Sequence, residues 1–418
     1  MICQRYALLL FVVFRVTAYS CPGPVLLVIG TRPEGIKMIP VYTALKEAHI
    51  PVLLCATGQH SDLLEDIFTA FGVQPDFRFN IMKPGQDLFY ITTAVLDNMK
   101  MILQEIKPSM VLVQGDTTSA LAAALAAFYV KIPVGHVEAG LRTGIINAPY
   151  PEEMNRCFIS LIASYHFAPT ALSVANLAKE NIDPETIFCV GNTVVDALAM
   201  MSETIAAQRN AVSASLQETI AWCTKNNKKV VLLTAHRRES FDTGLVSIFN
   251  AMRSLLQQHA DLAIIYPMHP NPIIKQRFLE TDLNRCENIF VTAPLNYTDM
   301  IYLLHNVDFI ATDSGGIQEE AVSLGKPVLI LRNETDRPEG VLYGAAQLVG
   351  TDTQTIIAAA NRLLVDSWAR EHSTIYGDGT AAKKIAHIIT RLLSKEKCNE
   401  PKNDTHSFRA GVYNQLPG

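Results

Sequence analysis

The chain has 418 residues, of which 49% are hydrophobic and 18% are charged, and its formal net charge is −5. This is the composition of a globular protein long enough for two domains of about 150–200 residues each. No basic face is indicated, which excludes nucleic acid as an expected partner.

Residues 1–23 contain an apolar run from position 7 to position 14, followed by small residues. Such a run resembles a signal peptide and is too short to span a membrane. Arg15 interrupts it, so we interpret residues 1–23 as an N-terminal extension. The eight cysteines form no CxxC pair, which favours reduced thiols and predicts no zinc site. We therefore expect a cytoplasmic protein that does not associate with membranes.

Residues 24–200 are predicted to form a first α/β domain. Apolar runs at 25–30, 51–57, 110–114 and 131–137 are typical of parallel strands buried on both faces, and helical segments are expected at 62–71, 86–106 and 120–128. Short strands at 165–168 and 187–190 and a helix at 194–201 complete it.

Two cations follow the first strand of this domain. Arg32 stands at the strand end, Pro33 suits the first turn of a helix, and Lys37 lies about one turn later. Open α/β sheets bind ligands at the carboxyl edge of their strands. We therefore expect Arg32 and Lys37 to bind an anion, with solvated surface charges as the alternative.

Carboxylates also gather at this predicted edge, namely Asp116, Glu138, Glu152 and Glu153. Closely placed carboxylates push one another's pKa values apart, which suits general acid–base catalysis. The alternatives are structural: Asp116 as a helix cap, and one of Glu152 and Glu153 as a favourable charge in a first helical turn.

A second α/β series follows a hinge expected near 195–210, and residues 201–370 are predicted to form its domain. Strands are expected at 229–234, 263–266, 289–291, 307–312 and 327–331, with helices at 353–364 and 381–393. The polar segment 395–418 is expected to be disordered. The two halves repeat similar strand-end patterns, so the predicted fold has two doubly wound Rossmann-like domains facing across a cleft.

The turn after the strand at 307–312 predicts phosphate binding. Ser314, Gly315 and Gly316 precede a helix, whose first turn carries unpaired N–H groups and partial positive charge. Glu320 could accept hydrogen bonds from sugar hydroxyls. A serine-capped loop is the alternative.

Two further strand-end groups stand in the second half. His236 could donate to a phosphate or shuttle a proton, and Arg337 could pair with a diphosphate, with a surface salt bridge as the alternative.

Together these motifs resemble the non-hydrolysing UDP-N-acetylglucosamine 2-epimerase family over residues 24–394. The residues that carry the resemblance are GTRPE at 30–34, GDT at 115–117, HVEAGLRT at 136–143, PEE at 151–153, GNT at 191–193, HRRES at 236–240, DSGGIQEE at 313–320 and RPE at 337–339.

The resemblance implies the two-domain fold of GT-B glycosyltransferases, with residues 371–394 crossing back to the first domain, and a homodimer. It implies an isomerase that interconverts UDP-GlcNAc and UDP-ManNAc through 2-acetamidoglucal, without cofactor or metal, for cell-surface polysaccharide synthesis. By match, the catalytic residues would be Asp116, Glu138, Glu152 and His236. The substrate-binding residues would be Arg32, Lys37, Asp116, Glu138, His236, Ser314, Gly315, Gly316, Glu320 and Arg337.

The chain departs from the family pattern at a few positions. Leu295 and Met300 stand where relatives often have Gln and Phe near the uracil, and Ala94 stands where an activator-binding Arg is expected. Three alternatives stay open: a hydrolysing epimerase, an epimerase for a modified UDP-sugar, and a GT-B glycosyltransferase.

Overall fold

The computed structural model describes residues 23–59, 61–83, 85–208, 211–237, 240–365 and 373–399. The expected N-terminal extension up to residue 22, and residues 400–418 of the expected tail, lie outside the described residues. Within the described part, each helix is too short or too polar to cross a membrane.

The first half is built on a seven-stranded parallel sheet in the order β3-β2-β1-β4-β5-β6-β7. Its strands are β1 (Val25–Ile29), β2 (Val52–Ala56), β3 (Phe77–Arg78), β4 (Met110–Gln114), β5 (Val134–Val137), β6 (Tyr165–Ala168) and β7 (Ile187–Cys189). The residues of β1, β4 and β5 are all buried, as their continuous apolar runs predict for strands covered on both faces. Only the short β3 had no strand predicted for it.

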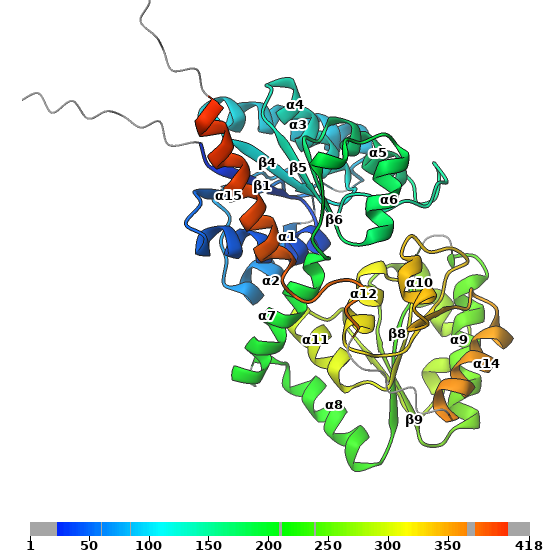
Figure 1. Ribbon diagram of the computed structural model, residues 1–418. Helices are drawn as coiled ribbons and strands as arrows, with labels where there is room; N and C mark the ends of the chain where they lie inside the picture. Colours follow the sequence, from blue (N-terminus) through cyan, green and yellow to red (C-terminus); the bar gives the residue numbers. More distant parts are fainter. Residues whose placement is uncertain are drawn as a thin grey trace, which may run out of the picture.

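Helices cover both faces of this sheet (Figure 1). They are α1 (Arg32–Glu47), α2 (Ser61–Phe71), α3 (Leu88–Ile106), α4 (Thr118–Tyr129), α5 (Glu152–Ile162), α6 (Ala171–Lys179) and α7 (Thr193–Ala207). Side-chain caps begin several of them, including Asp87 for α3 and Thr117 for α4.

The second half has a six-stranded sheet in the order β10-β9-β8-β11-β12-β13, again all parallel. Its strands are β8 (Lys229–Thr234), β9 (Leu262–Pro267), β10 (Ile289–Thr292), β11 (Phe309–Thr312), β12 (Val328–Ile330) and β13 (Ala346–Leu348). In each sheet the strand order reverses beside the first strand, between β1 and β4 and between β8 and β11. Doubly wound sheets bind ligands at such reversals.

The helices of the second half are α8 (Ala214–Lys225), α9 (Gly244–Gln258), α10 (Pro272–Leu279), α11 (Tyr297–Asn306), α12 (Gly315–Ser323), α13 (Pro338–Leu342), α14 (Thr353–Val365) and α15 (Ala381–Asn399). The last of them, α15, lies against α1 in the first lobe (Figure 1), where Ile385 and Ile389 are fully buried. The Asp196 carboxylate accepts hydrogen bonds from the Ala381 and Ala382 amides and so fixes the start of α15.

The predicted boundaries differ in detail from the observed elements. The domain boundary expected at residue 200 lies inside α7, and its position stays a prediction. The weakly patterned segment after residue 202 contains the end of α7 and all of α8, and α15 continues to Asn399 instead of ending near 393. Cys55 and Cys223 are buried free thiols, whereas Cys189 is exposed.

Candidate active site

A cleft of about 580 Å³ lies between the two halves. Its walls come from the carboxyl ends of both sheets, as the strand-end residues predict. All residues singled out from the sequence as catalytic or substrate-binding line this cleft, namely Arg32, Lys37, Asp116, Glu138, Glu152, His236, Ser314, Gly315, Gly316, Glu320 and Arg337.

Asp116 follows β4 and faces the cleft with 25% of its side-chain surface exposed. It does not cap α4, because the Thr117 hydroxyl accepts the Ala120 amide at 3.0 Å and fills that position. The capping alternative for Asp116 is therefore wrong. Enclosure by protein raises the pKa of Asp116 to about 6, against the opposing charge of Arg156 at 3.2 Å. A carboxyl group with such a pKa exchanges protons readily near neutral pH.

Glu138 is buried and adopts a left-handed backbone conformation, with φ of 63°. One carboxylate oxygen accepts hydrogen bonds from Lys37 and from the Asn192 amide, and the other accepts one from Gln114. Burial opposes the charged form, yet Lys37 and Arg337 lower the pKa of Glu138 below its usual value. Glu138 is thus held as an anion. A non-glycine residue in this conformation costs about 1–3 kcal/mol, and such strain clusters at functional sites.

Glu152 and Glu153 have different surroundings. Glu153 binds the amides of Thr143 and Gly144 and lies 3.3 Å from Arg156, so it orders the loop before α5. Glu152 lines the cleft and has a buried carboxylate oxygen without a hydrogen-bond partner. Of the two, Glu152 is therefore the one left free for chemistry.

His236 and Asp313 both belong to the second half, where Asp313 holds His236 in place. The fully buried Asp313 carboxylate accepts hydrogen bonds from the amides of His236 and Arg237, and its other oxygen lies 3.1 Å from Nδ1 of His236. This contact orients the imidazole, whose side chain keeps 38% of its surface exposed. The sequence marked Asp313 only as the start of a turn; its position directly after β11 was the available signal.

The turn before α12 brings backbone to the cleft surface. Ser314 stands at the N-cap position without a side-chain capping bond. A Cβ atom on Gly315 would lie 2.6 Å from the Arg337 guanidinium, whereas one on Gly316 would meet open space. Gly315 thus allows Arg337 to pack against the turn, and the first turn of α12 presents its N–H groups to a ligand.

Lys37 is buried and Arg337 is partly buried, and both form charge pairs within the protein. Arg337 lies 2.7 Å from Glu319 and 2.8 Å from Asp336, so it is not a surface salt bridge. Lys37 contacts Glu138 and lies 3.3 Å from Glu319. Two protein carboxylates already surround the charge of Lys37, so the alternative of a solvated surface charge is wrong for this residue. The binding of an external anion by Lys37 stays a prediction.

Several residues that line the cleft or contact its charged groups were not identified as site residues from the sequence. Glu34, Arg156 and Asp336 line the cleft, and Asn192 and Glu319 are buried behind it. Only Glu34 had a local signal, since a Glu three residues after Thr31 is typical of a capping box. The other four residues form their hydrogen bonds and ion pairs mainly with residues far away in the sequence, so no local pattern marks them. Among the described residues, no group of three or more side chains has the arrangement of a metal site.

Glu34 allows a prediction about pH and stability. It accepts hydrogen bonds from the amides of Gly30 and Thr31 and from the Thr117 hydroxyl, but burial dominates and raises its pKa to about 7. The folded state therefore binds a proton more tightly than the unfolded state, so stability from this group is present below its ordinary pKa of 4.5 and is lost as pH rises through 7.

Between pH 4.5 and pH 8, the unfolding free energy of the wild type should fall by about 2–4 kcal/mol more than that of Glu34→Gln. Urea unfolding of both proteins across that range measures the difference. A difference in unfolding free energy between the two proteins that stays constant across this pH range would contradict the raised pKa of Glu34.

Three comparisons with known proteins indicate the same family. The family model described as UDP-N-acetylglucosamine 2-epimerase matches residues 43–390. The UDP-N-acetylglucosamine 2-epimerase of Salmonella typhimurium is 45% identical over 371 residues, which cover 87% of this chain and 98% of that protein.

The crystal structure of UDP-GlcNAc 2-epimerase from Neisseria meningitidis bound to UDP-GlcNAc has a TM-score of 0.82 at 39% identity, and the match covers 88% of this chain and 100% of that one. The Methanocaldococcus jannaschii UDP-GlcNAc 2-epimerase in complex with UDP-GlcNAc and UDP has a TM-score of 0.76 at 34% identity, with coverage of 88% and 99%. These similarities extend over both lobes and the cleft between them.

Proposed function

The chain belongs to the UDP-N-acetylglucosamine 2-epimerase family, and from its cleft we propose that it interconverts UDP-GlcNAc and UDP-ManNAc without net hydrolysis. The observation that carries the proposal is the placement of acid–base groups opposite a phosphate-binding turn. Asp116, Glu138 and Glu152 line one wall, and Ser314 and Gly316 line the other.

The chemistry needs groups that move a proton at a weakly acidic carbon. The proton at C2 of the sugar is removed as the C1–O bond to UDP breaks, which leaves UDP and 2-acetamidoglucal in the cleft. A proton then adds to C2 from the opposite face as UDP re-forms the bond at C1. Two faces of one carbon are served, so more than one carboxyl group is useful. No redox step occurs, because the intermediate and UDP together hold all the electrons of the substrate.

Each half of the protein has a role in these reaction steps. Asp116, Glu138 and Glu152 supply the acid–base groups, and the raised pKa of Asp116 suits both donation and removal of a proton. His236 and the first turn of α12 stabilise charge on the departing diphosphate. Arg32 and Arg337 add positive charge to the cleft. Glu320 interacts with Arg32 and Tyr297 and is placed to accept hydrogen bonds from ribose hydroxyls.

Proton NMR of UDP-GlcNAc with the protein in heavy water tests this function. We expect UDP-ManNAc carrying deuterium at C2, together with deuterated UDP-GlcNAc at equilibrium. Free ManNAc as the sole product would instead indicate a hydrolysing epimerase. Turnover only in the presence of an acceptor, without exchange at C2, would indicate a glycosyltransferase. Exchange confined to a modified UDP-sugar would change the substrate but not the reaction.

The proposal includes a cytoplasmic homodimer that supplies ManNAc units for cell-surface polysaccharide. The free described cysteines fit a reducing compartment. Helices α3, α4 and α5 pack side by side, and their exposed apolar side chains fit an interface with a second copy; they are Met101, Phe128, Tyr129, Phe158 and Leu161.

Light scattering should give twice the chain mass for the wild type and for Leu279→Glu, whose exposed leucine lies in α10 of the other half. Leu161→Glu should weaken self-association, because it would bury a charge in the interface. A monomeric wild type would refute the dimer, and a fully dimeric Leu161→Glu would place the interface elsewhere.

A further inference from the structure

Lys37 is shared between a catalytic carboxylate and a carboxylate of the second half. Its ammonium group contacts Glu138 and lies 3.3 Å from Glu319 of α12. The Asn192 amide repeats this arrangement, donating to Glu138 at 3.0 Å and to Glu319 at 3.1 Å. All four side chains are buried. Glu319 therefore reaches from the nucleotide-binding half into the surroundings of Glu138.

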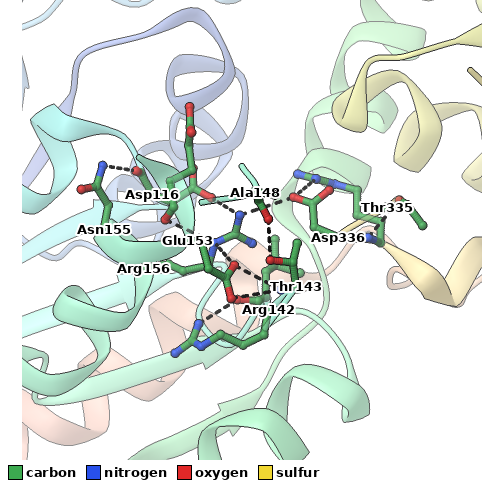
Figure 2. Close-up of polar contacts among 12 residues, drawn as sticks. Asp116, Arg142, Thr143, Ala148, Glu153, Asn155, Arg156, Thr335 and Asp336 are labelled. Carbon is green, nitrogen blue, oxygen red and sulfur yellow. Dashed lines mark hydrogen bonds and ion pairs between the residues drawn. The ribbon is translucent and has the colours of Figure 1, made fainter. Parts of the chain in front are cut away.

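Arg156, in α5 of the first half, is shared in the same way (Figure 2). Its guanidinium lies 3.2 Å from Asp116 and 3.6 Å from Asp336, which belongs to the loop after β12. The Arg156 side chain is 2% exposed and that of Asp336 is 7% exposed. Asp116 and Glu138 thus each share one buried cation with a carboxylate of the second half.

Arg337 connects the two second-half carboxylates, at 2.7 Å from Glu319 and 2.8 Å from Asp336. Its guanidinium also packs against Gly315 in the turn expected to hold the diphosphate. A continuous series of charged contacts therefore runs through Asp116, Arg156, Asp336, Arg337, Glu319, Lys37 and Glu138.

We propose that Asp336 is a positioning residue of the second half, which draws Arg156 partly away from Asp116 in the cleft that would hold the nucleotide sugar. This inference rests on the proposed function. A cation shared by two carboxylates stabilises each of them less than a cation with one partner. Asp116 is consequently a stronger base beside Asp336 than it would be if Arg156 had no partner in the second half.

The charges around Asp116 support this reasoning. Arg156 lowers the pKa of Asp116, whereas Glu138, Asp336 and Glu152 raise it. Asp336 is the member of this set that comes from the second half. Its removal should therefore lower the pKa of Asp116, because Arg156 would keep fewer competing partners.

Asp336→Asn tests the proposal. We expect kcat to fall about tenfold, and the inflection near pH 6 in kcat/KM to move to lower pH by about half a unit to one unit. Asp336→Glu restores the charge and should return the inflection toward its wild-type position. Glu334→Gln is the matched control, since it removes an exposed negative charge two residues away and should leave rate and inflection unchanged.

UDP binding by calorimetry shows whether each variant keeps a folded cleft. If Asp336→Asn does not bind UDP, Asp336→Ser takes its place, and the same loss of kcat with an inflection at lower pH is expected. A variant that binds UDP and loses activity with an unchanged pH profile would overturn the proposal and assign a merely structural role. Failure of the wild type to exchange deuterium at C2 would instead refute the proposed function.

Discussion

Asp116→Asn is expected to lower kcat by ~10²–10⁴-fold while UDP still binds. Asparagine keeps the size of the side chain but cannot take or return a proton. Asp116 combines a pKa raised to about 6 with exposure to the cleft, whereas Glu138 is held as an anion by Lys37. The loss of turnover should therefore exceed the loss of substrate affinity. Initial rates of C2 exchange give kcat, and calorimetry gives the Kd for UDP.

Asp97→Asn is the control, because Asp97 lies exposed on α3. Its activity should match the wild type. If Asp116→Asn kept activity within about threefold of the wild type, the assignment of Asp116 as an acid–base group would be wrong. If Asp116→Asn lost both UDP binding and turnover, the cleft would have been disrupted by Arg156, which loses its charged partner in this variant.

Lys37→Met is expected to destabilise the folded protein by about 3–5 kcal/mol at neutral pH. Methionine nearly matches the length of the lysine stem but leaves Glu138 and Glu319 without their shared cation. Both carboxylates are buried, with 5% and 1% of their side-chain surfaces exposed, so water cannot replace the lost charge. Urea unfolding at pH 7 measures the difference.

The pH dependence of this destabilisation follows from Glu138, whose pKa is lowered mainly by Lys37 against the effect of burial. A carboxylate with a lowered pKa contributes stability above its ordinary pKa of 4.5, and that stability is lost as pH falls through the folded value. The gap between wild type and Lys37→Met should therefore be largest at neutral pH and narrow below pH 4.5. Lys275→Met, at an exposed position of α10, should change stability by less than about 0.5 kcal/mol. Equal effects of the two substitutions would show that the Lys37 contacts contribute little.

Much of the fold was predictable because its strands are unusually apolar. The β1 segment reads VLLVI, and β4 and β8 contain the apolar runs MVLV and VVLL; a strand covered by helices on both faces needs such a run. Chemistry at strand ends was predictable for a related reason, because polar residues directly after a buried strand reach the edge where parallel sheets bind ligands. The short strands β3 and β13 and the continuation of α15 were missed, since none of them has a long local apolar pattern.

The sequence by itself determined two parallel α/β halves, the family, and the residue types gathered at the cleft. Only the tertiary structure decided which charges neutralise one another. Lys37 reads as a free cation in the sequence, but the structure places it between Glu138 and Glu319, and Asp336 reaches Arg156 from the other half. The physical reason is that electrostatic interaction depends on distance and burial. Neighbours along the chain specify a strand or a turn, whereas the charge state of a buried carboxylate depends on partners that folding brings from far away in the sequence.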